Sequence, residues 1–270
     1  MTLRAYLTQK LRGYYDKILS YADATIEDPA DTENLHQFRV NTRRAKTILK
    51  EFEDCFEPEY LQKAKSTLGD FIKMSNEARD IDVFIQRIKE YPLPEGMSLD
   101  ELKAVLQEMR LSVYDTLFGD LAKVSALLYA LQEPRFEACE EDVDEELKRR
   151  FSKRLDRIRK LGPVIESDEE FHALRIAIKR ARYMAELMVE RNLLKKQRLK
   201  KLKALQDRFG EIQDTAVETK KLFDLANAIS FAPSTVMAMG KMAGDLIERK
   251  ERLKRKLKGS LKKRLKKIGA

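Results

Sequence analysis

The sequence is poor in the residues that build disulfide frameworks, metal sites and base-stacking surfaces. It holds two cysteines, two histidines and no tryptophan among 270 residues. Cys55 and Cys139 stand far apart among helix-forming residues, without the spacing of a metal site or a disulfide framework. We therefore expect no metal, no cofactor and a reducing compartment.

Long apolar runs and enzyme motifs are also lacking. No uncharged run approaches the roughly 20 residues that a membrane span requires. The N-terminus is charged from Arg4 onward, unlike a signal peptide, so we expect a cytoplasmic protein. There is no P-loop, G-x-G-x-x-G, G-x-S-x-G or H-E-x-x-H motif. The sequence predicts a binding protein and not an enzyme.

Charge is abundant and unevenly distributed. The chain has 54 Lys and Arg against 45 Asp and Glu, a formal net charge of +9. Residues 1–140 hold 19 basic and 25 acidic side chains, whereas residues 141–270 hold 35 and 20. Such an excess favours acidic partners, with the second half supplying much of the attraction.

The apolar pattern predicts helices throughout. Positions recur at three and four residues, and no stretch alternates as a strand would. The seven prolines, with a phase slip near Arg191 and Asn192, divide the chain. Asp31 and either Ser167 or Asp168 suit helix N-caps. We expect an all-α fold of eight helices, at 2–27, 32–56, 59–90, 98–132, 141–161, 168–190, 195–229 and 234–267.

Part of the sequence is duplicated. LHQFRVNTRRAKTILKEF from Leu35 aligns without gaps to FHALRIAIKRARYMAELM from Phe171, and NEARDIDVF from Asn76 lies opposite GEIQDTAVE from Gly210. A period near 135 residues exceeds that of solenoid repeats. It predicts two pseudo-symmetric antiparallel four-helix bundles, residues 1–134 and 135–270.

Both copies carry a basic helix face opposite an apolar one. At about 100° per residue, His36, Arg39, Arg43 and Lys46 of the first copy fall within about 80° of one another. A single face of this kind is usually only solvated, but its duplication favours anion binding. Guanidinium groups bind phosphate oxygens in a bidentate way. Histidines near helix starts suit phosphate, although a structural role would explain them equally well. The candidate residues are His36, Arg39, Arg43, Arg44 and Lys46, then His172, Arg175, Lys179, Arg180 and Arg182.

The paired H-x-x-R-[VI]-x-x-[RK]-R signatures and the EARDIDVF segment resemble the CHAD family over essentially the whole chain. The resemblance implies two four-helix bundles facing a basic central groove that binds inorganic polyphosphate, sometimes at polyphosphate granules. It assigns the ten candidate residues to polyphosphate. Further groove contacts are expected from Arg79, Lys201 and Arg208, although surface ion pairing suits these three equally well. The triphosphatase domain often fused to such proteins, with its ExExK element, is not found here.

Two alternatives stay open. Nucleic acid, DNA or RNA, would also suit a basic face through its phosphates, although the faces lack aromatic residues for stacking. The segment from Arg249 holds twelve basic residues and one acid, with leucines spaced by four. It could extend the groove, contact nucleic acid, lie on an anionic membrane or pack its leucines on the bundle.

Overall fold

The chain folds into α-helices, and the computed structural model describes residues 1–137, 139–162 and 167–269. Within these ranges no strand forms, and β pairing is limited to two isolated bridges, Thr2 with Asp142 and Phe56 with Phe136. The predicted all-α fold is confirmed. The predicted break at Pro163 lies outside the described residues.

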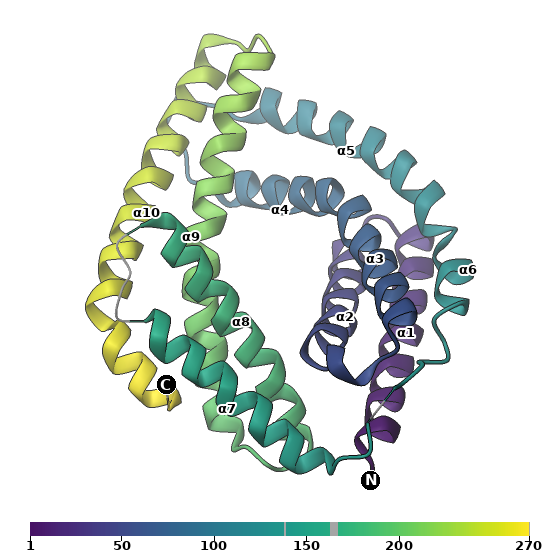
Figure 1. Ribbon diagram of the computed structural model, residues 1–270. Coiled ribbons are helices and arrows are strands. Elements are labelled where there is room, and N and C mark those ends of the chain that lie inside the picture. Colours follow the sequence, from purple (N-terminus) through teal and green to yellow (C-terminus); the bar gives the residue numbers. More distant parts are fainter. Residues whose placement is uncertain (138, 163–166, 270) are drawn as a thin grey trace. The chain divides into compact units, whose positions relative to one another are not determined.

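The helices group into two compact units (Figure 1). The first comprises residues 1–91 and 102–143, and the second comprises residues 92–101 and 144–270. The predicted domain division at residues 134 and 135 stays a prediction, as does the pseudo-symmetry of two four-helix bundles.

In the first unit, α2 packs against both α1 and α3, and α6 lies against α1. The side chains of Leu11, Phe38, Leu49 and Phe71 are almost completely buried in its core. Its elements are α1 (Leu3–Glu27), α2 (Thr32–Glu51), a 3-10 turn (Glu53–Cys55), α3 (Pro58–Met74), α4 (Asn76–Glu90), α5 (Asp100–Leu121, whose first two residues belong to the second unit) and α6 (Val124–Tyr129).

Two predicted helices proved wrong in this unit because each is interrupted. The predicted helix 59–90 breaks at Ser75, where the buried hydroxyl donates to the Phe71 carbonyl at 2.7 Å. The predicted helix 98–132 divides at residues 122–123 into α5 and α6. Neither break contains proline or glycine, and the apolar periodicity of the sequence continues across both. The sequence therefore gives no local signal of these two breaks.

In the second unit, α9 packs against both α8 and α10. Its elements are α7 (Val143–Leu161, whose first residue belongs to the first unit), α8 (Asp168–Glu190), α9 (Lys196–Ala228) and α10 (Pro233–Ile268). These bounds confirm the last four predicted helices to within two residues.

The predicted helix boundaries have clear local causes. Asp31 caps α2 by accepting from the Glu33 amide at 3.0 Å. Ser167 caps α8 through a reciprocal pair of hydrogen bonds with Glu170. After α8, Asn192 adopts φ 59°, a left-handed conformation that asparagine tolerates at helix ends. The predicted break between α8 and α9 is therefore confirmed.

The basic C-terminal segment forms the second half of α10 and packs against the unit. Leu257, Leu261, Leu265 and Ile268 are each at most 6% exposed. The end of α10 is held by Arg198 of α9, whose Nε donates to the Ile268 carbonyl at 2.7 Å. The leucine stripe thus belongs to the core.

Cys55 and Cys139 are both buried free thiols of the first unit. Burial raises the pKa of Cys139 well above its usual value, and a hydrogen bond with the Cys55 thiol raises it further. The Glu137 amide also donates to the Cys55 carbonyl at 3.1 Å. The fold therefore brings together two cysteines that are distant in sequence.

Candidate anion-binding faces

Arg39 is a buried residue that joins α2 to the junction of α3 and α4. Only 4% of the surface of Arg39 is exposed. Nη1 donates to the Ile72 carbonyl at 3.0 Å and to Ser75 Oγ at 2.7 Å, while Nη2 donates to Asn76 Oδ1 at 2.8 Å. Burial and the nearby Arg43 lower the pKa of Arg39 to about 10, which still leaves it charged at neutral pH. Arg39 therefore fixes the start of α4.

His36 stands beside three guanidinium groups. Burial lowers the pKa of its half-buried imidazole, and Arg79, Arg43 and Arg39 lower it further against the opposing charge of Glu33. Arg79 reaches this cluster from α4 and donates to the Thr32 carbonyl at 3.3 Å. Within the described residues, neither Arg43 nor Arg79 forms an ion pair with a carboxylate. These half-buried cations therefore lack an anionic partner of their own.

Lys46 lies on the same face of α2, and its side chain reaches Gly69 of α3. A Cβ at Gly69 would lie 2.8 Å from Lys46 Nζ, so the glycine makes room for the lysine side chain. Burial lowers the pKa of Lys46, with Asp70 opposing and three neighbouring lysines reinforcing the shift. Arg44, the fifth candidate of this copy, is half-buried and contacts neighbouring groups.

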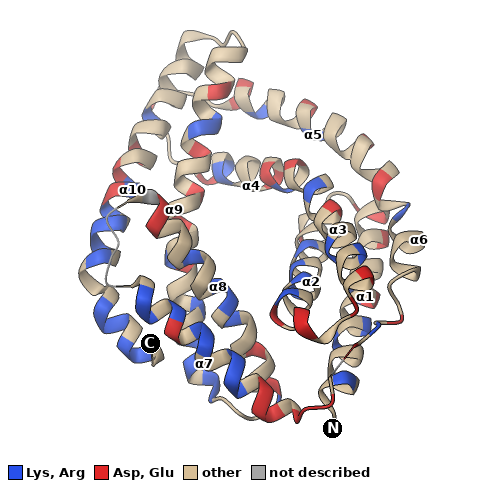
Figure 2. Cartoon of the chain, viewed as in Figure 1, with Lys and Arg blue, Asp and Glu red and all other residues tan. Residues whose placement is uncertain are grey.

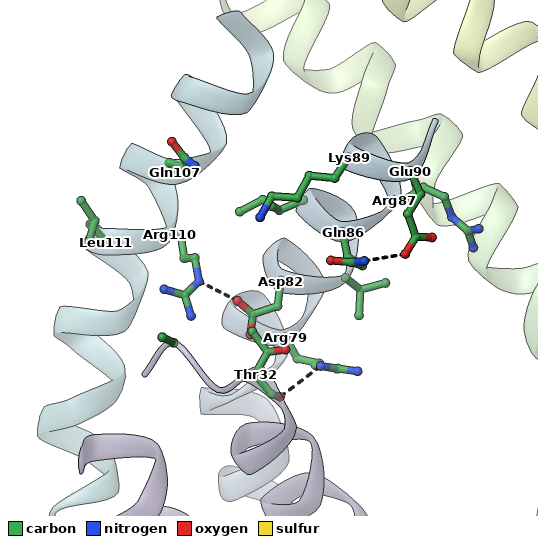
Figure 3. Close-up of a pocket in the computed structure, with 13 residues that line it drawn as sticks. Thr32, Arg79, Asp82, Gln86, Arg87, Lys89, Glu90, Gln107, Arg110 and Leu111 are labelled. Atoms are coloured by element: carbon green, nitrogen blue, oxygen red, sulfur yellow. Dashed lines mark hydrogen bonds and ion pairs between the residues drawn. The ribbon is translucent and has the colours of Figure 1, made fainter. Parts of the chain in front are cut away.

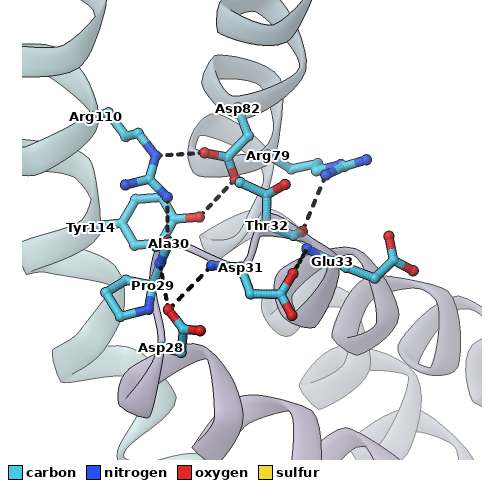
Figure 4. A network of polar contacts seen from close by, with 10 residues as sticks. All are labelled: Asp28, Pro29, Ala30, Asp31, Thr32, Glu33, Arg79, Asp82, Arg110 and Tyr114. Carbon is cyan, nitrogen blue, oxygen red and sulfur yellow. Dashed lines mark hydrogen bonds and ion pairs between the residues drawn. The ribbon is translucent and has the colours of Figure 1, made fainter.

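A buried carboxylate orients α4 relative to α5 (Figure 4). Asp82 is 6% exposed, and it accepts from Arg110 Nε and Tyr114 Oη at 2.7 Å each. Arg110 also donates to the Pro29 carbonyl in the turn before α2. Because this turn leads directly into α2, the network positions Arg79 relative to the start of α2.

A cavity of about 820 Å³ lies beside Arg79, between α4 and α5 (Figure 3). Arg79, Arg87, Lys89 and Arg110 line it, together with the exposed apolar side chain of Leu111. Its acidic lining residues are already engaged: Asp82 binds Arg110, and Glu90 accepts from Gln86 (Figure 3). The open side of Arg79 is therefore a basic environment.

In the second unit, α8 presents its own histidine and arginine at a smaller cavity. His172 is exposed, and Arg175 is half-buried with its Nε lacking a hydrogen-bond partner among the described atoms. Both line a cavity of about 420 Å³ to which α10 contributes Lys250 and Lys254. This cavity gathers four basic side chains from two helices, with Glu169 as its acidic lining residue.

The other candidates of α8 differ in their surroundings. Arg182 contacts other residues of α8, because Nη1 donates to Glu186 Oε1 at 2.8 Å and its guanidinium lies 4.0 Å from the Tyr183 ring centre, while its buried Nε has no hydrogen-bond partner among the described atoms. Arg180 is half-buried and forms no ion pair within the described part of the chain. Lys179 is half-buried and contacts neighbouring groups.

The secondary candidates are also dispersed. Arg79 lies in the cluster around His36. Lys201 and Arg208 are exposed on α9. Burial lowers the pKa of Arg264 on α10, and the charge of Arg208 lowers it further, so Arg208 faces α10.

Comparison with protein families gives a match to the CHAD domain over residues 9–222. The chain belongs to the CHAD domain family. No curated protein matches the chain significantly.

Two solved structures share this CHAD fold. The CHAD domain from the plant Ricinus communis has a TM-score of 0.77 at 21% identity, covering 98% of this chain and 92% of that one. PptA from Streptomyces chartreusis has a TM-score of 0.68 at 15% identity, covering 94% and 97%. These likenesses support the fold alone. In the described parts of the chain, no helix is long and apolar enough to cross a membrane.

The two copies of the CHAD repeat are not equivalent beyond their first helix. The position of Arg79 is taken by Gln213 in the second copy, and that of Asp82 by Ala216. Both Gln213 and Ala216 line the smaller cavity, where α10 supplies lysines. The second unit therefore draws its additional cations from another helix.

Sequence reasoning missed Lys250, Lys254, Asp82 and Arg110. The two lysines belong to a segment recognised as basic, but only the packing of α10 shows which of them meet α8. Asp82 stood within the quoted EARDIDVF segment, and nothing in that segment identifies its partner 28 residues later.

Proposed function

We propose that this CHAD chain binds inorganic polyphosphate through the faces of α2 and α8. Some members of the family bind polyphosphate. The observation that carries the proposal is the cluster of the half-buried His36, Arg43 and Arg79, whose two arginines form no ion pair with a carboxylate in the described chain. Mutual repulsion in such a cluster is relieved by a multivalent anion.

The geometry supports different proposed roles for the ten candidates. Arg39 and Arg182 act as positioning residues because their guanidinium groups are committed to protein acceptors. His36, Arg43 and Arg79 contact the ligand in the first unit, with Arg44 and Lys46 extending the face. His172, Arg175 and Arg180 contact it in the second unit, with Lys179, Lys250 and Lys254 beside them.

The test is polyphosphate binding by variants of each face, measured by titration calorimetry at near-physiological salt. The double variant Arg43→Gln and Arg79→Gln should weaken binding by about tenfold or more, because each charged hydrogen bond contributes roughly 1.5–3 kcal/mol. The matched control is Lys17→Gln with Lys63→Gln, which removes two exposed cations that lack ion pairs in the described structure. Equal losses in both double variants would refute a specific site.

We also propose that the faces bind polyphosphate without hydrolysing it. The carboxylates near the cluster are engaged in the fold or oppose the ligand by charge: Asp82 is bound by Arg110, Glu33 accepts from Gln37, and Asp80 lies near Arg39. Incubation with polyphosphate or nucleoside triphosphates, with and without magnesium, tests this. Sustained phosphate release that disappears in Arg43→Gln would overturn it.

A further inference from the structure

The second half of α10 presents an unpaired cationic surface that the proposed polyphosphate faces do not use. Between Arg252 and Gly269 the chain has no acidic residue. Eight basic side chains of this segment are exposed: Arg252, Arg255, Lys256, Lys258, Lys262, Lys263, Lys266 and Lys267. In Figure 2 the charged residues at the C-terminal end of α10 are all blue, the colour of Lys and Arg.

These cations have little to neutralise them in the folded chain. Lys258 lies 5.8 Å from the Phe171 ring centre. The other seven form no ion pair within the described residues. The array is also rigidly held, since the buried leucine stripe and the Arg198 contact fix the helix along its length. Repulsion along such a preformed array favours binding of a polyanion.

Seven of the eight exposed cations lie in two rows, and Lys258 lies beside them near the Phe171 ring. At about 100° per residue, Arg255, Lys262 and Lys266 fall on one side of the exposed face, and Arg252, Lys256, Lys263 and Lys267 fall on the other. Gly259 lies between the rows, and a Cβ there would meet open space. The array extends over about 22 Å at ~1.5 Å per residue.

We infer that this face of α10 binds the backbone of double-stranded nucleic acid independently of sequence. The major groove of B-DNA, about 12 Å wide, admits an α-helix, and phosphates line both of its edges. Two rows of cations on one helix match two phosphate strands, whereas a single flexible polyphosphate chain needs only one row. The face has no exposed aromatic, Asn or Gln side chain to read base edges.

An anionic membrane surface is a less suitable partner for this face. A helix that lies on a membrane buries its apolar stripe among the lipids. Here Leu257, Leu261 and Leu265 are buried in the protein, and no large apolar side chain on the described C-terminal half of α10 is exposed. The helix therefore offers charge without an apolar anchor.

The experiment measures binding of the full chain to a mixed-sequence DNA duplex by fluorescence anisotropy across a salt series. Lys256→Glu with Lys263→Glu should lower affinity at least tenfold and reduce the slope of log K against log salt by about 2. The matched control, Lys17→Glu with Lys63→Glu, changes net charge equally in the first unit and should have a much smaller effect. Equal losses in both variants would overturn the inference.

A second variant, Gly259→Glu, places an acid between the rows without removing any lysine. Its side chain meets open space, and glutamate favours helix more than glycine does. It should weaken duplex binding several-fold while circular dichroism stays unchanged. Unchanged duplex affinity would overturn the inference.

The source of the anion is distinguished by parallel titrations. The double variant Arg43→Gln with Arg79→Gln should still bind duplex DNA. A failure of the duplex-binding inference can therefore be told apart from a failure of the polyphosphate proposal. If the α10 variants reduce binding to vesicles of phosphatidylserine more than binding to duplex, the face is a membrane site and the inference is wrong. It is equally wrong if they reduce only polyphosphate binding.

Discussion

At the scale of single residues, two of the three arginines of the first signature, Arg39 and Arg43, differ in their contacts. Arg39 donates three hydrogen bonds to buried or partly buried acceptors, whereas Arg43 has no side-chain acceptor within the described chain. Their positions in the sequence pattern are alike, and both lie on the basic face. Only the packing of α3 against α2 separates the structural Arg39 from Arg43, which we propose to bind the ligand.

Replacing these two arginines should therefore change the free energy of unfolding by very different amounts. Arg39→Ala should lower the free energy of unfolding by about 2–4 kcal/mol, because it leaves buried acceptors without a donor. Arg43→Gln should change it by less than about 0.5 kcal/mol while still weakening polyphosphate binding. Urea denaturation of both variants checks this, and an Arg39→Ala protein as stable as wild type would contradict it.

His36 should couple polyphosphate binding to pH. Burial and the neighbouring arginines hold the pKa of His36 below 6.5, so the free imidazole is neutral at pH 7. A bound polyanion favours imidazolium, so binding takes up a proton and strengthens as the solution becomes mildly acidic. Calorimetry in buffers of different ionisation enthalpy measures this uptake. If His36→Gln takes up as many protons as wild type, His36 is not the coupled group.

The stability of the free protein should decrease at mildly acidic pH, whereas polyphosphate binding should strengthen there. Because the pKa of His36 is lowered on folding, the unfolded chain binds more protons below about pH 6.5, and stability falls as pH decreases through that value. His36→Gln should reduce this loss. Thermal melts between about pH 7.5 and 5.5 test it, with the exposed His172→Gln as control. Identical pH dependence in wild type and His36→Gln would contradict the account.

At the scale of helices, periodicity predicted where apolar faces lie but not every break. The apolar face predicted opposite the basic one is buried in α2, where it comprises Phe38, Ala45, Ile48 and Leu49. The division at Ser75 was missed because it depends on Arg39, which lies 36 residues earlier. A tertiary contact of this kind leaves no local signal in the sequence.

Asp82 should be among the most sensitive residues for the arrangement of α4 and α5. Asp82→Ala removes the acceptor of Arg110 and Tyr114 and leaves a partly buried guanidinium unpaired. Loss of a buried pair typically costs about 3–5 kcal/mol. Chemical denaturation measures it. The control is Asp80→Ala, whose side chain is exposed, and equal stabilities of the two variants would refute the role of the network.

At the scale of the whole molecule, charge excess and the duplicated signature predicted the family correctly. The tail was recognised as basic and amphipathic, but its leucines could equally have contacted lipid, and only their burial against the unit decides between these alternatives. Deletion of residues 251–270 would remove part of this core. Charge substitutions on α10 therefore probe its function more cleanly than truncation.

The shared groove implied by the family resemblance stays a prediction, and chain length tests it. A polymer long enough to contact both faces gains avidity, often by 10²- to about 10⁴-fold. Affinity should then rise sharply above a threshold polyphosphate length. The rise should vanish when either Arg43 or Arg180 is replaced by Gln. A smooth dependence on length in wild type would mean that the faces bind independently.

The central claim is that the α2 and α8 faces bind polyphosphate, and the most direct test replaces both at once. Calorimetry with long-chain polyphosphate should compare wild type, the quadruple variant His36→Gln, Arg43→Gln, His172→Gln and Arg180→Gln, and the Lys17→Gln with Lys63→Gln control. The variant and the control each lose two permanent cations. We predict that the quadruple variant loses at least a hundredfold in affinity and the control less than threefold. Similar affinities for the two proteins would contradict the account.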